Sequence, residues 1–267
     1  MKEMSEAAFE GTQSGRAEQA CERKRNFQKE LDRMLQKIPA GEHTLLLHSC
    51  CAPCSSYCME YLREYFRITV FFFNPNITER EEYEKRVAEE KRLIAAYNRQ
   101  VADGCFTGMH STDRAQRIEI LEGRYCPQDF YEMAKGYEQC REGGERCMRC
   151  YELRLKETAK TAAEGGFDFF STTLSISPLK NAAALNKIGG VLSEKYGVPY
   201  LYSDFKKKNG YKRSVELSAQ FGLYRQDYCG CAYSKAERER LKGNRGDGIE
   251  KRDAFGRAVL RREDIQK

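Results

Sequence analysis

Short apolar runs alternate with longer amphipathic stretches along most of this 267-residue chain. Each run has the length of a single strand, and the run at Ile68–Phe73 is apolar except for Thr69, which is typical of a strand buried on both faces of a parallel sheet. Strands that alternate with helices predict an α/β fold of three layers, with a parallel sheet in the Rossmann-like manner. The predicted strands are Thr44–His48, Ile68–Phe73, Phe167–Ser171 and Val198–Tyr202.

Helical spacing of apolar residues predicts the elements between these strands. Phe27, Leu31, Met34 and Leu35 share one face of a predicted helix over Asn26–Lys37. Further helices are predicted at about 55–65, 115–121, 128–137, 147–164 and 181–196.

The longest predicted helix runs from Thr78 to Asn98. Thr78 and Glu81 have the spacing of a capping box, in which the two side chains cap the first turn reciprocally. A weak strand is predicted just after this helix, at Gln100–Ala102.

The chain divides into three predicted parts. Residues 1–40 form an N-terminal extension, disordered before residue 22 and then helical. Residues 41–240 form a catalytic α/β domain, and residues 241–267 form a charged tail. Within the domain, the irregular segment at about 103–146 is predicted to be a cysteine-bearing cap over the carboxyl edge of the sheet, where open α/β folds place their ligands.

Composition makes the cysteines the unusual feature. Charged residues amount to 32%, no apolar run is long enough for a membrane span, and the N-terminus has no secretory signal pattern, so we expect a cytosolic protein without a membrane partner. Twelve cysteines in a cytosolic chain indicate metal binding or redox chemistry.

Two cysteine groups have the arrangement of metal ligands. Cys50 and Cys51 follow the first predicted strand, and Cys147 and Cys150 open a predicted helix as C-x-x-C. Four thiolates from two loops suit a four-iron cluster or a zinc ion. Because neighbouring side chains are expected to diverge, the adjacent pair modestly favours the cluster.

A third group, Cys229-Gly230-Cys231, indicates redox chemistry. Glycine between the two cysteines relieves the backbone strain of a close-spaced disulfide, and a strained disulfide is easily reduced. The alternative is a second metal bound by Cys229 and Cys231 with Cys54 nearby.

Several polar residues remain open to a functional and a structural interpretation. His48 either orients a ligand or shuttles a proton, or is a hydrogen-bonded histidine at a strand end. Tyr224, Arg225 and Tyr228 either clamp a nucleotide or pack in the core. The net charge of +6 decides little, but a basic segment is either a solvated loop or a phosphate-binding patch, with the cations Lys206, Lys207, Lys208, Lys212 and Arg213.

Taken together, these motifs resemble the QueH family of epoxyqueuosine reductases. The matching pieces are HSCCAPC at 48–54, FFNPNI at 72–77, EYEKR at 82–86, RCMRCYELRL at 146–155, STTLSISPLKN at 171–181 and the segment at 204–234 that ends in YRQDYCGCAYS. Their common order over residues 44–234 makes the resemblance specific.

The resemblance implies an adenine-nucleotide-hydrolase-like fold and an iron–sulfur reductase that converts epoxyqueuosine to queuosine in tRNA. It implies a [4Fe-4S] cluster on Cys50, Cys51, Cys147 and Cys150, and a redox-active pair of Cys229 and Cys231. It also implies an additional iron ion, for which Cys54, Cys229 and Cys231 are the candidate ligands, and an external electron donor. With tRNA as substrate, the basic segment and Arg225 are predicted to bind RNA.

Two other functions remain as alternatives. An ATP-dependent tRNA sulfurtransferase would carry a glycine-rich S-G-G-x-D-S phosphate loop after the first strand, where this chain has HSCCAPC. A zinc-stabilised RNA-binding module without catalysis would use the same cysteines and would be colourless, whereas an iron–sulfur protein is brown.

Overall fold

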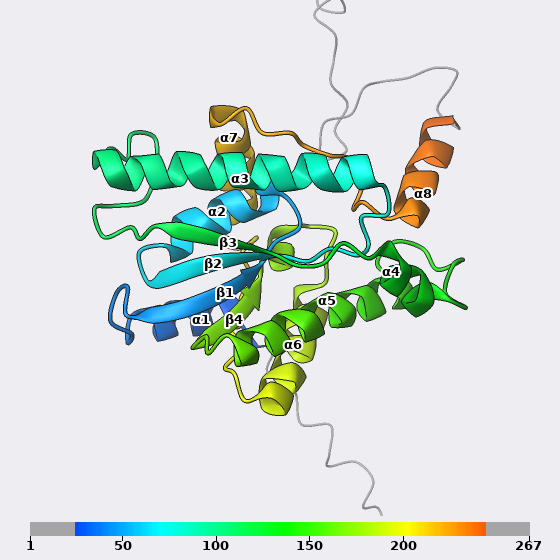
Figure 1. Ribbon diagram of the computed structural model, residues 1–267, viewed down its shortest axis with the longest axis horizontal. Coiled ribbons are helices and arrows are strands. Elements are labelled where there is room, and N and C mark those ends of the chain that lie inside the picture. The colour runs from blue at the N-terminus through cyan, green and yellow to red at the C-terminus, as the bar shows by residue number, and fades with distance from the viewer. Residues whose placement is uncertain (1–24, 244–267) are drawn as a thin grey trace, which may run out of the picture.

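The computed structural model describes residues 25–243 and contains a sheet of four parallel strands between two layers of helices (Figure 1). The strand order is β3-β2-β1-β4, so β1 is central. The predicted parallel α/β fold of three layers is therefore confirmed, while the predicted disorder before residue 22 and most of the predicted tail lie outside the described residues. The strands are β1 (His43–His48), β2 (Phe66–Phe72), β3 (Ile118–Glu122) and β4 (Phe169–Thr172). The helices are α1 (Phe27–Leu35), α2 (Ala52–Leu62), α3 (Arg80–Asp103), α4 (Pro127–Ala134), α5 (Glu145–Glu164), the 3-10 helix η1 (Thr173–Ile176), α6 (Ala182–Tyr196), α7 (Gly210–Gln220) and α8 (Ala232–Gly243).

Both faces of the central strand are buried. Leu45 and Leu47 pack into one apolar core, and Leu46 between them packs into the other. The first core also contains side chains of α1, α2, α3 and α7, and the second contains side chains of α5 and α6. A strand buried on both faces needs continuous apolar sequence, which explains the run Leu45–Leu47 in β1. β2 alternates at first, with Arg67 exposed and Thr69 half-buried, and is buried throughout from Val70.

The long helix differs from its prediction at both ends. Glu79 is the residue before the first turn of α3 and makes no side-chain capping bond, so the predicted capping box is not formed. The helix continues through the predicted weak strand Gln100–Ala102 and ends where Gly104 adopts a left-handed conformation. Glycine tolerates this conformation without steric penalty, which makes it a common helix terminator.

Two further elements differ from the sequence predictions. The predicted helix at 115–121 is instead the edge strand β3, which pairs with β2, so part of the predicted cap segment belongs to the sheet. The predicted strand Val198–Tyr202 is reduced to a single bridge between Phe170 and Tyr200. Pro199 offers no N–H to a strand ladder, which is the physical reason that pairing stops there.

The carboxyl ends of β1, β2 and β4 meet at one edge of the sheet, and α4, α8 and the first turn of α5 lie at that same end (Figure 1). The chain after each strand therefore contributes to a common region, as expected for an open parallel sheet. Within residues 25–243 the structure contains no helix of sufficient length and apolar character to cross a membrane.

Candidate metal and redox site

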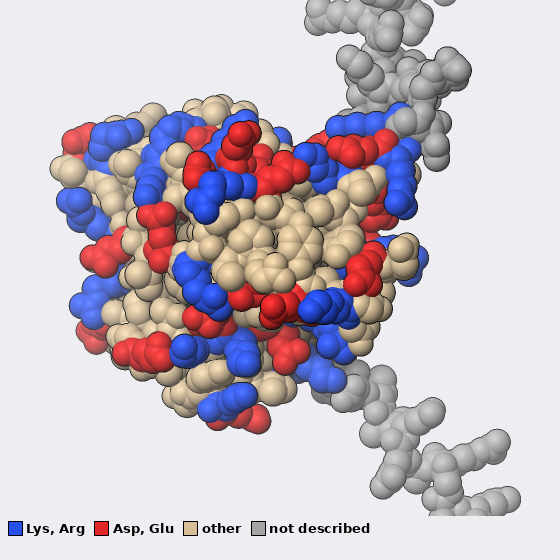
Figure 2. Space-filling view, turned by 45° about the vertical axis from the view of Figure 1, so that its right-hand side comes forward, with Lys and Arg blue, Asp and Glu red and all other residues tan. Residues whose placement is uncertain are grey.

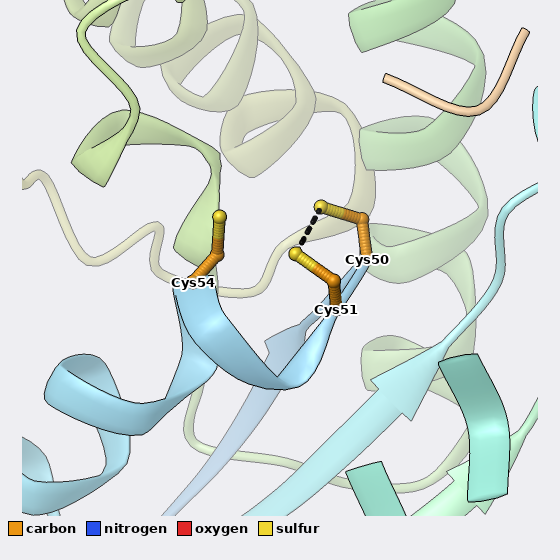
Figure 3. A group of neighbouring side chains, drawn as sticks. All are labelled: Cys50, Cys51 and Cys54. Atoms are coloured by element: carbon orange, nitrogen blue, oxygen red, sulfur yellow. Dashed lines mark hydrogen bonds between the residues drawn. The ribbon is translucent and has the colours of Figure 1, made fainter. Parts of the chain in front are cut away.

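The first cysteine group lies in the loop between β1 and α2. The sulfur atoms of Cys50 and Cys51 are 3.9 Å apart, and those of Cys50, Cys51 and Cys54 all lie within 4.8 Å of one another (Figure 3). The adjacent cysteines therefore converge, and the expectation that they diverge is wrong. Cys51 is fully extended, with φ of −174° and ψ of 148°, and α2 begins immediately after it, which turns Cys54 back toward the pair.

Hydrogen bonds fix this loop from both sides. The backbone N–H of Ser49 donates to the carbonyl of Phe71, and Asn74 donates from its side chain to the carbonyl of Ser49 over 2.7 Å. Asn74 belongs to the turn that follows β2, so the loops after β1 and β2 are joined. The cysteine loop is consequently held rigidly at the sheet edge.

The second group opens α5, as predicted. Cys147 and Cys150 are buried on its first turns, and the N–H of Gly143 donates to the sulfur of Cys147 over 3.3 Å. Cys147 packs in the same apolar cluster as Cys50 and Cys51, whereas Cys150 packs with Cys231.

The third group lies between α7 and α8. The sulfur atoms of Cys229 and Cys231 are 3.4 Å apart, and all eleven cysteines that the structure describes are free thiols. Gly230 has a φ of +107°, a conformation that favours glycine, and a Cβ at this position would lie 2.8 Å from Ile77. Its carbonyl accepts from the N–H of Thr78, so this loop is also anchored to the turn after β2.

Cysteines of the second and third groups line a common pocket. Cys147, Cys150, Cys229 and Cys231 all contribute to its wall. Sequence reasoning missed the other residues of this wall, which are Asn76, Phe130, Arg146, Tyr151, Arg154 and Lys180. All of these except Phe130 lie within a motif of the resemblance, but their direction into the pocket depends on tertiary structure.

Thiols in this region differ in acidity. Hydrogen bonds from Cys51 and Cys54 hold the pKa of the Cys50 thiol well below its usual range, and Arg154 adds to this effect against the cost of burial. A hydrogen bond from Cys231 likewise lowers the pKa of Cys229. Burial instead raises the pKa of Cys150 to about 11. Cys50 and Cys229 are therefore the more acidic thiols of their groups.

The environment of Arg154 shows whether these residues fit a metal bound by thiolates. Its side chain is 3% exposed, and it donates to the side-chain oxygens of Asn74 and Asn76, at 3.1 Å each, which are neutral acceptors. Its Nε is buried and has no partner among residues 25–243. A buried guanidinium without an anion is unfavourable by several kcal/mol. Burial lowers the pKa of Arg154, and Cys150, Cys50 and Cys229 raise it, so cysteines that bind a metal as thiolates are the groups placed to supply the missing charge. The residues present thus fit a metal group held by cysteine.

His48 has a structural environment. It is fully buried, its Nδ1 lies 2.9 Å from the hydroxyl of Thr172, and its Nε2 lies 3.2 Å from the carbonyl oxygen of Phe73. Burial lowers its pKa to about 3, with a contribution from Arg154, so the ring is neutral. These contacts favour the hydrogen-bonded strand-end histidine over a proton shuttle.

The predicted RNA-binding cations lie apart from the cysteine pocket and are mostly ion-paired. Arg213 is 12% exposed and forms an ion pair of 2.7 Å with the buried Glu60. Arg225 donates to the hydroxyl of Ser218. The four lysines of the segment are more exposed, and three have carboxylate partners: Lys206 with Asp204, Lys208 with Asp32 and Lys212 with Glu216.

Comparison with known proteins gives a consistent family. The family model described as epoxyqueuosine reductase QueH matches residues 45–237. A relative of that name from Streptococcus pyogenes serotype M1 is 40% identical over 191 residues, which cover 72% of this chain and 70% of the relative. Another, from Staphylococcus epidermidis, is 38% identical over 226 residues, or 82% of this chain and 90% of the relative. A third, from Thermotoga maritima, is 36% identical over 195 residues, or 73% and 92%.

Proposed function

Since this chain belongs to the epoxyqueuosine reductase QueH family, we propose that it reduces epoxyqueuosine at the wobble position of tRNA to queuosine, the final step of queuosine biosynthesis. The reaction removes the epoxide oxygen with two electrons and two protons and releases water. The observation that carries the proposal is the convergence of the cysteine groups on a region that also buries cations.

The proposed cofactor is a [4Fe-4S] cluster on Cys50, Cys51, Cys147 and Cys150. When bound, such a cluster supplies electrons one at a time. The chain would balance the negative charge of the four thiolates with the buried guanidinium of Arg154. Burial of all four cysteines would keep water away from the metal.

A second iron ion is proposed beside the cluster, with Cys54, Cys229 and Cys231 as candidate ligands. The position of Cys54 suits a ligand of either the second iron or the cluster, because its sulfur lies within 4.8 Å of the sulfurs of Cys50 and Cys51. The separation of 3.4 Å between the sulfurs of Cys229 and Cys231 also suits a redox-active pair. Oxidation of two thiols to a disulfide releases two electrons and two protons, which is the stoichiometry of epoxide removal.

Recognition of tRNA is proposed to use phosphate contacts from the basic segment and Arg225. Lys207, Lys208 and Lys212 are exposed, and the surface ion pairs of Lys208 and Lys212 are weak enough to exchange for phosphate. Arg213 holds the buried Glu60, so its main contribution is expected to be structural. Around the sheet edge, the surface shows a broad uncharged patch with charged side chains at its margin, which suits the stacking of loop bases (Figure 2).

The direct test is a nucleoside mass analysis. Protein reconstituted with iron and sulfide is incubated anaerobically with epoxyqueuosine-containing tRNA and a strong one-electron reductant, which replaces the external electron donor. Loss of one oxygen atom from the nucleoside establishes the reaction. An unchanged nucleoside in the presence of an intact brown cluster contradicts it, and a colourless zinc-loaded protein would favour the RNA-binding module. With tRNA as substrate, the cytoplasm is the proposed location.

A further inference from the structure

Lys180 is a largely buried cation at the start of a helix, an energetically unfavourable position that the backbone around it does not offset. It precedes Asn181, whose side chain caps the first turn of α6. The positive end of a helix dipole lies there and disfavours a cation. The Lys180 side chain is nevertheless only 10% exposed and lines the pocket with Cys147, Cys150, Cys229 and Cys231.

The ammonium group of Lys180 has unused hydrogen-bonding capacity. Its Nζ donates one hydrogen bond, to Oε1 of Glu142 over 3.0 Å, within residues 25–243. An ammonium carries three N–H groups, so this bond leaves donors for a ligand. Burial lowers the pKa of Lys180, but Cys229, Tyr151 and Glu142 together raise it, so the group stays charged.

Tyr151 presents a second donor in the same pocket. Its side chain is 1% exposed, and its buried hydroxyl has no hydrogen-bond partner in the described part of the chain. A buried polar group without a partner destabilises a fold by about 1–3 kcal/mol. Phenylalanine would fill the same space without this cost. Burial raises the pKa of Tyr151 to about 12 and Lys180 opposes that rise, so the two groups also interact electrostatically.

The two arginines of the pocket wall are each partly engaged by other residues, although the Nε of each has no partner among the described residues. Arg146 donates to the carbonyl oxygens of Tyr137 and Glu138, and Arg154 donates to two asparagine side chains. A guanidinium moreover stays protonated and cannot release a proton to a substrate. Lys180 therefore differs from both arginines in being able to transfer a proton.

We propose that Lys180 and Tyr151 form an oxygen-binding site, in which both donate hydrogen bonds to the epoxide oxygen of the substrate and Lys180 protonates it. This inference rests on the proposed function and assigns two residues to its chemistry. Preorganised donors aimed at developing negative charge are among the strongest contributions to catalysis.

Atoms and electrons balance in this scheme. Both bonds from carbon to the epoxide oxygen break, the two carbons become joined by a double bond, and the oxygen leaves as water. Two electrons come from the external low-potential donor that the reductase requires. Lys180 gives one proton as the first bond breaks and is reprotonated from solvent through Glu142, which is 25% exposed. The second proton reaches the oxygen by the same route.

Four variants test the site: Lys180→Gln, Lys180→Arg, Tyr151→Phe and Glu142→Gln. Single-turnover rates of epoxide loss are measured together with iron and sulfide content, thermal stability and affinity for an anticodon stem-loop. We expect the Lys180→Gln rate to fall about 10²- to 10⁴-fold. The rate of Tyr151→Phe is expected to fall roughly 10- to 10²-fold, which is at most the effect of removing one donor from an oxyanion site. Lys180→Arg keeps the charge but cannot give a proton, so its rate stays low.

Metal content and RNA affinity should stay at the wild-type level in these variants. Tyr151→Phe should be at least as stable as wild type, because it removes a buried hydroxyl that has no partner among the described residues. Tyr200→Phe, a buried tyrosine outside the pocket, is the matched control and should keep the wild-type rate. Rates within about threefold of wild type for both Lys180→Gln and Tyr151→Phe would overturn the site. Glu142→Gln interrupts the proposed reprotonation of Lys180, so its rate is expected to fall as well, and an unchanged rate in this variant would overturn that proton route. Metal loss that parallels the lost rate would also overturn it. If wild-type protein itself converts no substrate, the proposed function fails instead.

Discussion

Asn76 donates from its side-chain amide to the carbonyl oxygen of Cys229 over 3.2 Å, although the two residues are 153 positions apart. The same asparagine accepts a hydrogen bond from Arg154 through its side-chain oxygen. One residue of the turn after β2 thus fixes both the loop that carries Cys229 and the buried guanidinium of Arg154. The relative positions of the cysteine groups therefore depend on this turn.

Replacing Asn76 by Ala should loosen the Cys229 loop. We expect the free energy of unfolding to fall by about 1–3 kcal/mol, because buried partners lose their hydrogen bonds. Cys229 should also react faster with an alkylating reagent, which mass spectrometry of the metal-free protein would detect. Asn98→Ala is the control, because Asn98 makes two comparable bonds to the backbone of Ile118 at the sheet edge. An equal increase of Cys229 reactivity in both variants would contradict the local role.

Replacing Arg154 by Met should make the reconstituted centre harder to reduce. A positive charge beside a metal cluster favours the more negative, reduced state, so its removal lowers the reduction potential by roughly tens of millivolts. The measurement is a reductive titration followed by electron paramagnetic resonance. Arg63→Met is the comparison, since Arg63 is also buried but bonds to Ser111 and Tyr97 away from the pocket. A potential that shifts equally in both would point to a general loosening of the fold.

Cysteine variants separate the two proposed metal positions. Cys147→Ala should lose most bound iron and all turnover, because a cluster corner loses its ligand. Cys54→Ala should retain the cluster sulfide and lose about one iron per protein if Cys54 binds the second ion. Elemental analysis with a sulfide assay decides between these results. Loss of sulfide in Cys54→Ala would instead place Cys54 on the cluster.

Convergence of the cysteines could be predicted from the sequence because it follows from strand order. Cys50 and Cys51 follow β1, the central strand, and parallel strands bring their carboxyl ends to one edge. The sequence predicts a helix where the structure has β3. Ile118 and Ile120 do alternate with charged residues, as in a strand, but so short a segment indicates the strand period only weakly.

The pocket wall could not be predicted in the same way. Arg154, Tyr151 and Lys180 are ordinary residues of helical or loop segments in the sequence. Their significance comes from burial without sufficient partners, which is a tertiary property. The convergence of the sulfurs of Cys50 and Cys51 likewise depends on the extended backbone of Cys51, which composition and spacing do not specify.

Removing the lysines of the basic segment should weaken RNA binding. The triple variant Lys206→Ala, Lys207→Ala and Lys208→Ala is expected to bind an anticodon stem-loop more weakly and with a shallower salt dependence, by up to about 0.7 per lost phosphate contact. Fluorescence anisotropy over a range of salt concentrations measures both quantities. A control with equal net charge replaces the exposed Lys160, Lys187 and Lys195 of α5 and α6. Matching slopes in the two variants would show that the segment is only a solvated loop.

Glu90 provides a pH-dependent contribution to stability. It lies on α3 with no exposed surface, its Oε2 accepts from the hydroxyl of Ser49, and its Oε1 has no partner in the described residues. Burial raises its pKa from 4.5 to about 8. Below about pH 4.5 the carboxyl is protonated in both the folded and the unfolded state, so it contributes no pH-dependent difference.

As the pH rises from about 4.5 to 8, the unfolded state gains charge at Glu90 before the folded state does. The free energy of unfolding should therefore fall over this interval, by on the order of a few kcal/mol from this group. Glu90→Gln removes the titration while keeping a side chain of similar size, so the stability of the variant relative to wild type should increase between pH 5 and pH 8. Urea unfolding of both metal-free proteins at several pH values measures this difference, in which the titration of the shared cysteines largely cancels. A difference that stays constant with pH would show that the carboxyl of Glu90 is ionised in the folded protein.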